Sequence, residues 1–111
     1  MKKTLEKAAK IFGKKSLKDL SLVLVGDSQI KKLNRIYRKK NCVTDVLSFE
    51  GLNEIFICLP QAERQAKKLK KSLKNELTRL LAHGIVHLQG FDHKTKAETE
   101  IMKSWEEKIL K

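Results

Sequence analysis

Cysteine and long apolar runs are what this sequence lacks most clearly. It holds two cysteines, Cys42 and Cys58, and they do not form a Cys-x-x-Cys pair. This excludes a disulfide framework and a cysteine-based zinc motif, and it fits a reducing compartment. No window approaches about eighteen consecutive apolar residues, and residues 1–6 carry charge without an apolar segment after them. We therefore expect a cytoplasmic protein that neither spans a membrane nor is exported.

Acidic residues are also scarce. The 111 residues include 25 Lys and Arg but only 13 Asp and Glu, which gives a net charge of +12. Such an excess favours polyanionic partners, and nucleic acid is the first candidate. A lysine-rich surface of the kind found in heat-adapted proteins is the alternative. The length fits one domain, residues 1–111, without repeats or linkers.

Histidine occurs three times, and all three copies lie within residues 83–93. On a helix, His83 and His87 stand one turn apart on the same face. Gly90 can adopt a left-handed conformation that ends the helix and turns His93 back toward them. Three histidine ligands would leave a position on a zinc-like ion open to water or substrate. Alternatively, the histidines bind no metal: His83 and His87 lie at the border of the apolar face of the helix, and His93 caps the end of the helix.

The spacing His-x3-His-x5-His is similar to the long zinc signature of metzincin proteases. In that signature a glutamate follows the first histidine and acts as the general base. Here the position is Gly84, which cannot accept a proton. The sequence therefore has the ligand spacing of a metal hydrolase without the base of a peptidase.

Two blocks resemble the YbeY family of bacterial endoribonucleases. Residues 83–93, HGIVHLQGFDH, match the signature H-G-x-x-H-x-x-G-[YF]-D-H, and residues 37–40 with 44–49 resemble Y-R-x-K followed by T-D-V-L-S-F. The resemblance implies a metal-dependent, single-strand-specific ribonuclease acting in ribosomal RNA maturation, with ribosomal RNA and ribosomal particles as partners. It implies one divalent ion, expected to be zinc, on His83, His87 and His93, and Arg38 as a catalytic residue. Glu54 stands where the family has an aspartate, and its role stays open.

The apolar pattern predicts an α+β fold, a mixed sheet of three or four strands packed by about five helices. Residues 21–25 are a continuous apolar run, which favours the central strand. Residues 46–49 and 55–59 form strands joined by a tight hairpin. A helix starting near Ser72 should carry its apolar stripe into the histidine motif, which places the metal site at the end of a core helix. Thr95 should open the last helix through a capping box.

Two side chains near the predicted site have alternative interpretations. Glu76 lies two turns before His83 on the same side, so it could orient an imidazole or simply complement the helix dipole. Tyr37 falls on the predicted inner face of the helix that begins near Asp27, together with Ile30 and Leu33.

The mechanism predicted from these residues uses Arg38 and His83 as catalytic groups. Arg38 would neutralise the charge that develops on the phosphate. The proton acceptor stays open between a hydroxide on the metal, a histidine of the metal-free site, Asp92 and Glu54. Two other functions are compatible with the motif. One is a metal-dependent hydrolase of a peptide or small phosphoester, and the other is a non-catalytic RNA-binding factor of ribosome assembly.

Overall fold

The structure, a computed structural model, describes residues 2–13, 17, 19–90 and 95–110. In this part of the chain lie five α-helices, three strands and one short 3₁₀ helix, Glu50–Leu52. The helices are α1 (Lys2–Phe12), α2 (Asp27–Arg38), α3 (Leu59–Lys68), α4 (Leu73–Leu88) and α5 (Lys96–Leu110). The strands are β1 (Ser21–Val25), β2 (Val46–Phe49) and β3 (Glu54–Cys58). The predicted α+β class is confirmed.

The three strands form one mixed sheet in the order β1-β3-β2. β3 pairs in parallel with β1 and antiparallel with β2, so that Val23 and Leu47 both lie opposite Phe56. β2 and β3 form the predicted hairpin, which closes through the 3₁₀ helix and Asn53, a residue with a φ of 52°.

The prediction that residues 21–25 form the central strand is wrong, because β1 lies at the edge of the sheet and β3 is central. A continuous apolar run indicates that both faces of a strand are covered by helices. It does not indicate whether one or both edges of the strand pair with other strands. Coverage of β1 is itself incomplete, since Leu24 is 51% exposed.

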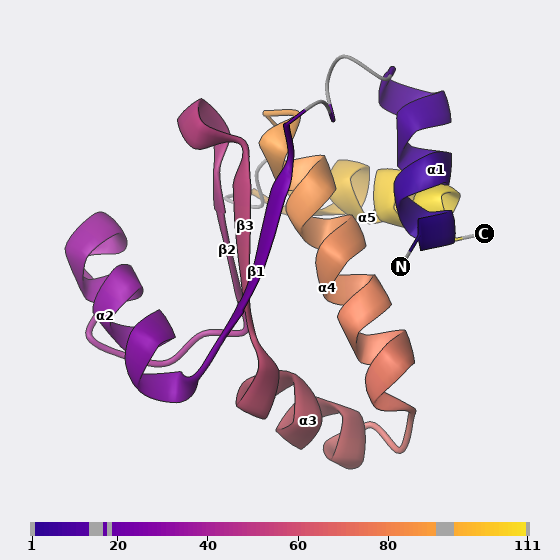
Figure 1. Ribbon diagram of the computed structural model, residues 1–111. Coiled ribbons are helices and arrows are strands. Elements are labelled where there is room, and N and C mark those ends of the chain that lie inside the picture. The colour runs from indigo at the N-terminus through magenta and orange to yellow at the C-terminus, as the bar shows by residue number, and fades with distance from the viewer. Residues whose placement is uncertain (1, 14–16, 18, 91–94, 111) are drawn as a thin grey trace.

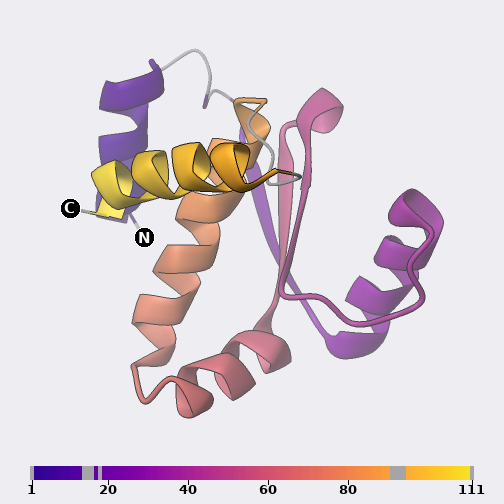
Figure 2. The same ribbon diagram turned by 180° about the vertical axis from the view of Figure 1, so that it is seen from behind.

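Helices cover the two faces of the sheet unequally. α2 lies on one side, while α4 lies on the other with α1 and α5 behind it (Figures 1 and 2). The side chains of β3 alternate between these layers: Ile55 and Ile57 are buried in the core beneath α4, and Cys58 is buried in a smaller core with Ile30 of α2. α4 is therefore enclosed between the sheet and two helices.

The start and end of α4 agree with the sequence. The Ser72 hydroxyl accepts a hydrogen bond from the backbone N–H of Asn75 at 3.1 Å, which caps the helix. At the other end, Gly90 has a φ of 93° and its N–H donates to the carbonyl of His87 at 3.0 Å. Leu80, Leu81 and Ile85 are almost completely buried, so the helix that carries the histidines is fixed along its length.

The last helix opens at the predicted residue, with one hydrogen bond of the predicted capping box. The Thr95 hydroxyl accepts a hydrogen bond from the backbone N–H of Glu98 at 3.1 Å. α5 then crosses α4 and packs on α1, where the rings of Trp105 and Phe12 lie 5.3 Å apart. No helix within the described ranges combines the length and the apolar character needed to cross a bilayer.

Candidate functional site

A cleft of about 880 Å³ opens between the end of α2, strand β2 and the C-terminal half of α4. It brings together Arg38, His83 and His87, which lie up to 49 positions apart in the sequence. Its other lining residues are Tyr37, Lys40, Thr44, Asp45, Val46, Leu47, Ser48, Phe49 and Thr99. Three of the four predicted site residues thus share one concave surface, and the fourth, His93, lies outside the described residues.

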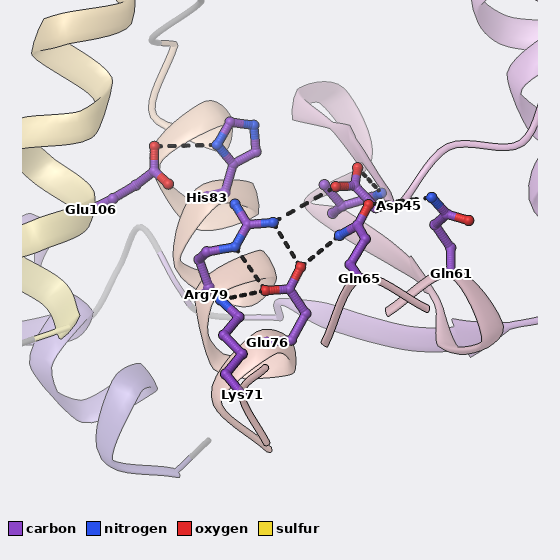
Figure 3. Close-up of polar contacts among 9 residues, drawn as sticks. Asp45, Gln61, Gln65, Lys71, Glu76, Arg79, His83 and Glu106 are labelled. Atoms are coloured by element: carbon purple, nitrogen blue, oxygen red, sulfur yellow. Dashed lines mark hydrogen bonds and ion pairs between the residues drawn. The ribbon is translucent and has the colours of Figure 1, made fainter. Parts of the chain in front are cut away.

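His83 has a carboxylate partner. Its Nδ1 atom lies 3.2 Å from Oε2 of Glu106 on α5, and both side chains are largely buried (Figure 3). When Nδ1 carries the proton and donates it to this carboxylate, the lone pair is on Nε2. This pairing fixes the ring orientation and makes Nε2 a better metal ligand.

The described residues contain only part of the predicted metal site. His83 and His87 lie one helical turn apart on α4 and both line the cleft. Within residues 2–13, 17, 19–90 and 95–110, no three His, Cys, Asp or Glu side chains converge closely enough to hold a metal ion. The set of three predicted ligands includes His93 and therefore stays a prediction.

Arg38 is the last residue of α2 and is exposed at the cleft. The helix ends at Lys39, which adopts a left-handed φ of 58° and donates its N–H to the carbonyl of Arg35 at 3.1 Å. Buried Asn34 ties the following loop to the helix, because its side-chain amide donates to the carbonyl of Cys42 at 2.9 Å. The backbone that carries Arg38 is thus held on both sides.

Gly84 lies at the contact between α4 and the sheet. A Cβ built there would meet two carbons of Ile55 at 3.0 Å and the Ser48 hydroxyl at 3.1 Å. That hydroxyl also donates to the carbonyl of Gly84 at 3.3 Å. A glutamate, the metzincin base, has no space at this position, so glycine here serves the close packing of α4 against β2 and β3.

A family model described as "Endoribonuclease YbeY" matches residues 1–111. The chain belongs to the YbeY family. A protein of Phytoplasma australiense named "Endoribonuclease YbeY" is 44% identical over 104 residues, covering 83% of this chain and 72% of the relative. A protein of Aquifex aeolicus with the same name is 44% identical over 91 residues, covering 74% of this chain and 61% of the relative.

A solved structure supports the same relationship. The solution structure of a protein from Thermotoga maritima aligns with a TM-score of 0.60 and 33% sequence identity, covering 96% of this chain and 79% of that protein. The predicted YbeY resemblance is confirmed.

The first turn of α4 in this YbeY chain carries a buried acidic residue, Glu76, with no exposed surface. Its carboxylate accepts hydrogen bonds from Gln65 and Arg79 and pairs with Lys71, at 2.6 to 2.9 Å (Figure 3). Burial alone would raise the pKa of Glu76, but these partners together lower it to about 2. Among the described residues Glu76 contacts no imidazole, and the carboxylate that contacts His83 is that of Glu106.

Arg79 connects this buried cluster to the cleft. Its Nη2 atom lies 2.8 Å from Oε2 of Glu76 and 3.9 Å from Oδ2 of Asp45, a residue that lines the cleft (Figure 3). Asp45 also accepts a hydrogen bond from the N–H of Val46 at 2.8 Å. The cluster thus links α3 and the first half of α4 to Asp45, which precedes β2 and lines the cleft.

Sequence reasoning identified neither Glu106 as a partner of His83 nor the exposure of Tyr37. Glu106 follows His83 by 23 positions on another helix, so only the crossing of α4 and α5 brings the two together. Glu54 is the first residue of β3. It is not among the described residues that line the cleft.

Proposed function

We propose that this protein is a metal-dependent endoribonuclease that cleaves single-stranded RNA, and that ribosomal RNA and ribosomal particles are its partners in the cytoplasm. One observation carries the proposal: in a YbeY-family chain, Arg38 of α2 and His83 and His87 of α4 line the same cleft. The names of the relatives support RNA as the substrate. The two free cysteines, Cys42 and Cys58, are consistent with a reducing compartment.

Charge supports the choice of substrate. The chain has a net charge of +12, and six exposed cations lie between residues 31 and 40, on α2 and directly after it. They are Lys31, Lys32, Arg35, Arg38, Lys39 and Lys40. Arg38 and Lys40 also line the cleft, so the basic surface continues into the site. Phosphates of a single strand can follow this surface toward the histidines.

The residues present fit a zinc ion. Imidazole nitrogens suit zinc, and the Glu106 carboxylate on His83 is the kind of partner that metal-binding histidines have. His83, His87 and His93 would hold the ion and leave a coordination position open. Once bound, the metal would polarise a phosphate oxygen and activate water at neutral pH.

Arg38 supplies the second positive charge of the proposed site. Its guanidinium is planar and stays charged, so it can donate two parallel hydrogen bonds to phosphate oxygens. Because Arg38 and the histidines come from different elements that face one cleft, a phosphate can lie between them. Arg38 would then stabilise the negative charge that grows on the phosphate during cleavage.

The proposal is tested by incubating zinc-loaded protein with a labelled single strand and with the matching RNA duplex. Cleavage of the single strand alone is expected. His87→Ala should lose cleavage, while Glu63→Gln, a change at an exposed residue of α3 outside the cleft, should keep it. Binding without cleavage under any metal condition would instead favour a non-catalytic assembly factor.

A further inference from the structure

Tyr37 is exposed at the mouth of the cleft, although helical periodicity predicts that it faces inward. Of the three residues predicted to face inward, Ile30 is fully buried and Leu33 is partly buried, but Tyr37 is 61% exposed. The C-terminal turn of α2 stands away from the strands in both views of the fold (Figures 1 and 2). Tyr37 lines the cleft next to Arg38.

The exposed ring is held in place by other aromatic rings. Its centroid lies 5.0 Å from that of Phe49, at an interplanar angle of 60°. Phe49 in turn lies 5.7 Å from Phe56 of the central strand, at 73°. A row of three rings thus runs from the sheet to the mouth of the cleft. A ring held in this way loses little conformational freedom when a ligand binds to it.

The surroundings of Tyr37 favour a nucleotide as that ligand. Arg38 and Lys40 are exposed on the same cleft, where they can contact the phosphates on either side of a base. Aromatic rings within a basic groove are the usual platform for unpaired bases. A base within a duplex has both of its faces covered by neighbouring base pairs, so only an unpaired base can stack on such a ring.

We propose that Tyr37 forms a stacking site for one unpaired base of the RNA strand bound in the cleft, and that this contact contributes to the preference for single strands. The inference rests on the proposed function and extends it, because it assigns a base-binding residue that is separate from the phosphate-binding Arg38. Tyr37 acts in substrate binding, whereas the histidines and Arg38 act on the reacting phosphate.

The test compares Tyr37→Leu with Tyr37→Phe and Tyr37→Trp in single-turnover cleavage of a labelled single strand by the zinc-loaded protein. Leucine keeps an apolar cover over Phe49 but has no aromatic face. Tyr37→Leu should raise the protein concentration that gives half-maximal rate by about tenfold or more, with a smaller change in the maximal rate. Phenylalanine and tryptophan should remain close to wild type.

A second measurement separates stacking from charge. Unlabelled oligoadenylate and an abasic strand of equal length are used as competitors, since both carry the same phosphates. Oligoadenylate should compete about tenfold better against the wild type, and this difference should disappear in Tyr37→Leu. Leu52→Ala, a change at an apolar residue that is 64% exposed on the 3₁₀ helix, is the control and should leave both constants unchanged.

The outcomes distinguish this inference from the proposed function. If the wild type cleaves the single strand and Tyr37→Leu does so with the same half-maximal concentration, the stacking site is wrong and the ribonuclease stands. The exposed ring would then be a cover for Phe49 or a contact for another protein. If the wild type cleaves no single strand, both fail. Thermal unfolding of each variant verifies that the fold is retained.

Discussion

The Nδ1 atom of His83 lies 3.2 Å from Oε2 of Glu106, and this contact joins the helix that carries the histidines to the helix that crosses it. Both residues also line a smaller cavity of about 360 Å³ on the α5 side of His83. His83 is therefore positioned from one side by α5 and faces the cleft on the other.

Removing this carboxylate should weaken the metal site without unfolding the protein. Glu106→Ala is expected to lower zinc affinity by about tenfold to a hundredfold, the usual effect of losing the carboxylate partner of a ligand histidine. Competition with a chromogenic chelator measures the affinity. Glu107→Gln, at the exposed neighbouring position, is the control and should bind zinc like the wild type. Equal zinc affinity in Glu106→Ala would show that Glu106 does not position a ligand.

Stability should depend on pH through Glu76. The pKa of Glu76 is about 2 in the folded protein, against an ordinary value of 4.5, so protonation disfavours the fold. The stabilisation is complete above about pH 5 and is lost as the pH falls from there toward 2. It amounts to roughly 3 kcal/mol of unfolding free energy. Urea unfolding between pH 7 and pH 2.5 measures it.

The same residue can be tested by substitution. Glu76→Gln should lose about 3 kcal/mol at pH 7, because Lys71 and Arg79 would lose their buried charged partner. The variant should also show a flatter decline in stability toward acid pH. Glu63→Gln, at an exposed position of α3, should match the wild type at pH 7. An unaltered acid profile in Glu76→Gln would assign the pH dependence to other groups.

Replacing Gly84 with glutamate, the residue that metzincins have at this position, should destabilise the fold. Gly84→Glu would force a carboxylate into a contact where even a Cβ lies 3.0 Å from Ile55. We expect a loss of at least about 3 kcal/mol in unfolding free energy, or failure to fold. Gly51→Glu, where a Cβ meets nothing within 4 Å, should change stability by less than about 0.5 kcal/mol. Similar denaturation midpoints for the two variants would contradict the packing role of Gly84.

Arg38 can be separated from its basic neighbours by one matched pair of substitutions. Arg38→Lys keeps the charge but loses the planar guanidinium, and it should lower the single-turnover rate at saturating RNA by roughly a hundredfold. Arg35→Lys is the same change one turn earlier, at an exposed residue outside the cleft, and should retain the rate. Equal rates in the two variants would reduce Arg38 to one of several cations that attract RNA.

Local spacing accounts for the parts of the fold and site that the sequence predicts well. Ser72 and Gly90 delimit α4 through hydrogen bonds to near neighbours in sequence, and four residues separate His83 from His87. Such features depend on helix geometry alone. The match of two blocks to one family predicted that Arg38 and the histidines share a site, which no local pattern could show.

Tertiary contacts determine the features that could not be predicted from the sequence. The apolar pattern of residues 21–25 is compatible with the edge or the centre of a sheet. In the described part of the chain β1 pairs only with β3, which makes it an edge strand. Tyr37 has the periodicity of a core residue, but its side chain is 61% exposed on the last turn of α2, which stands away from the strands (Figure 1). Glu106 meets His83 only because α5 crosses α4.

The most direct test of the central claim is the single-turnover cleavage rate of a labelled single-stranded RNA by chelator-treated protein as zinc is returned. We expect negligible cleavage without metal, a rate that saturates at about one equivalent of zinc, and a loss of at least roughly a hundredfold in His87→Ala. Cleavage at the full rate by the treated protein without zinc, or by His87→Ala as fast as by the wild type, would contradict a metal-dependent ribonuclease with His87 as a ligand.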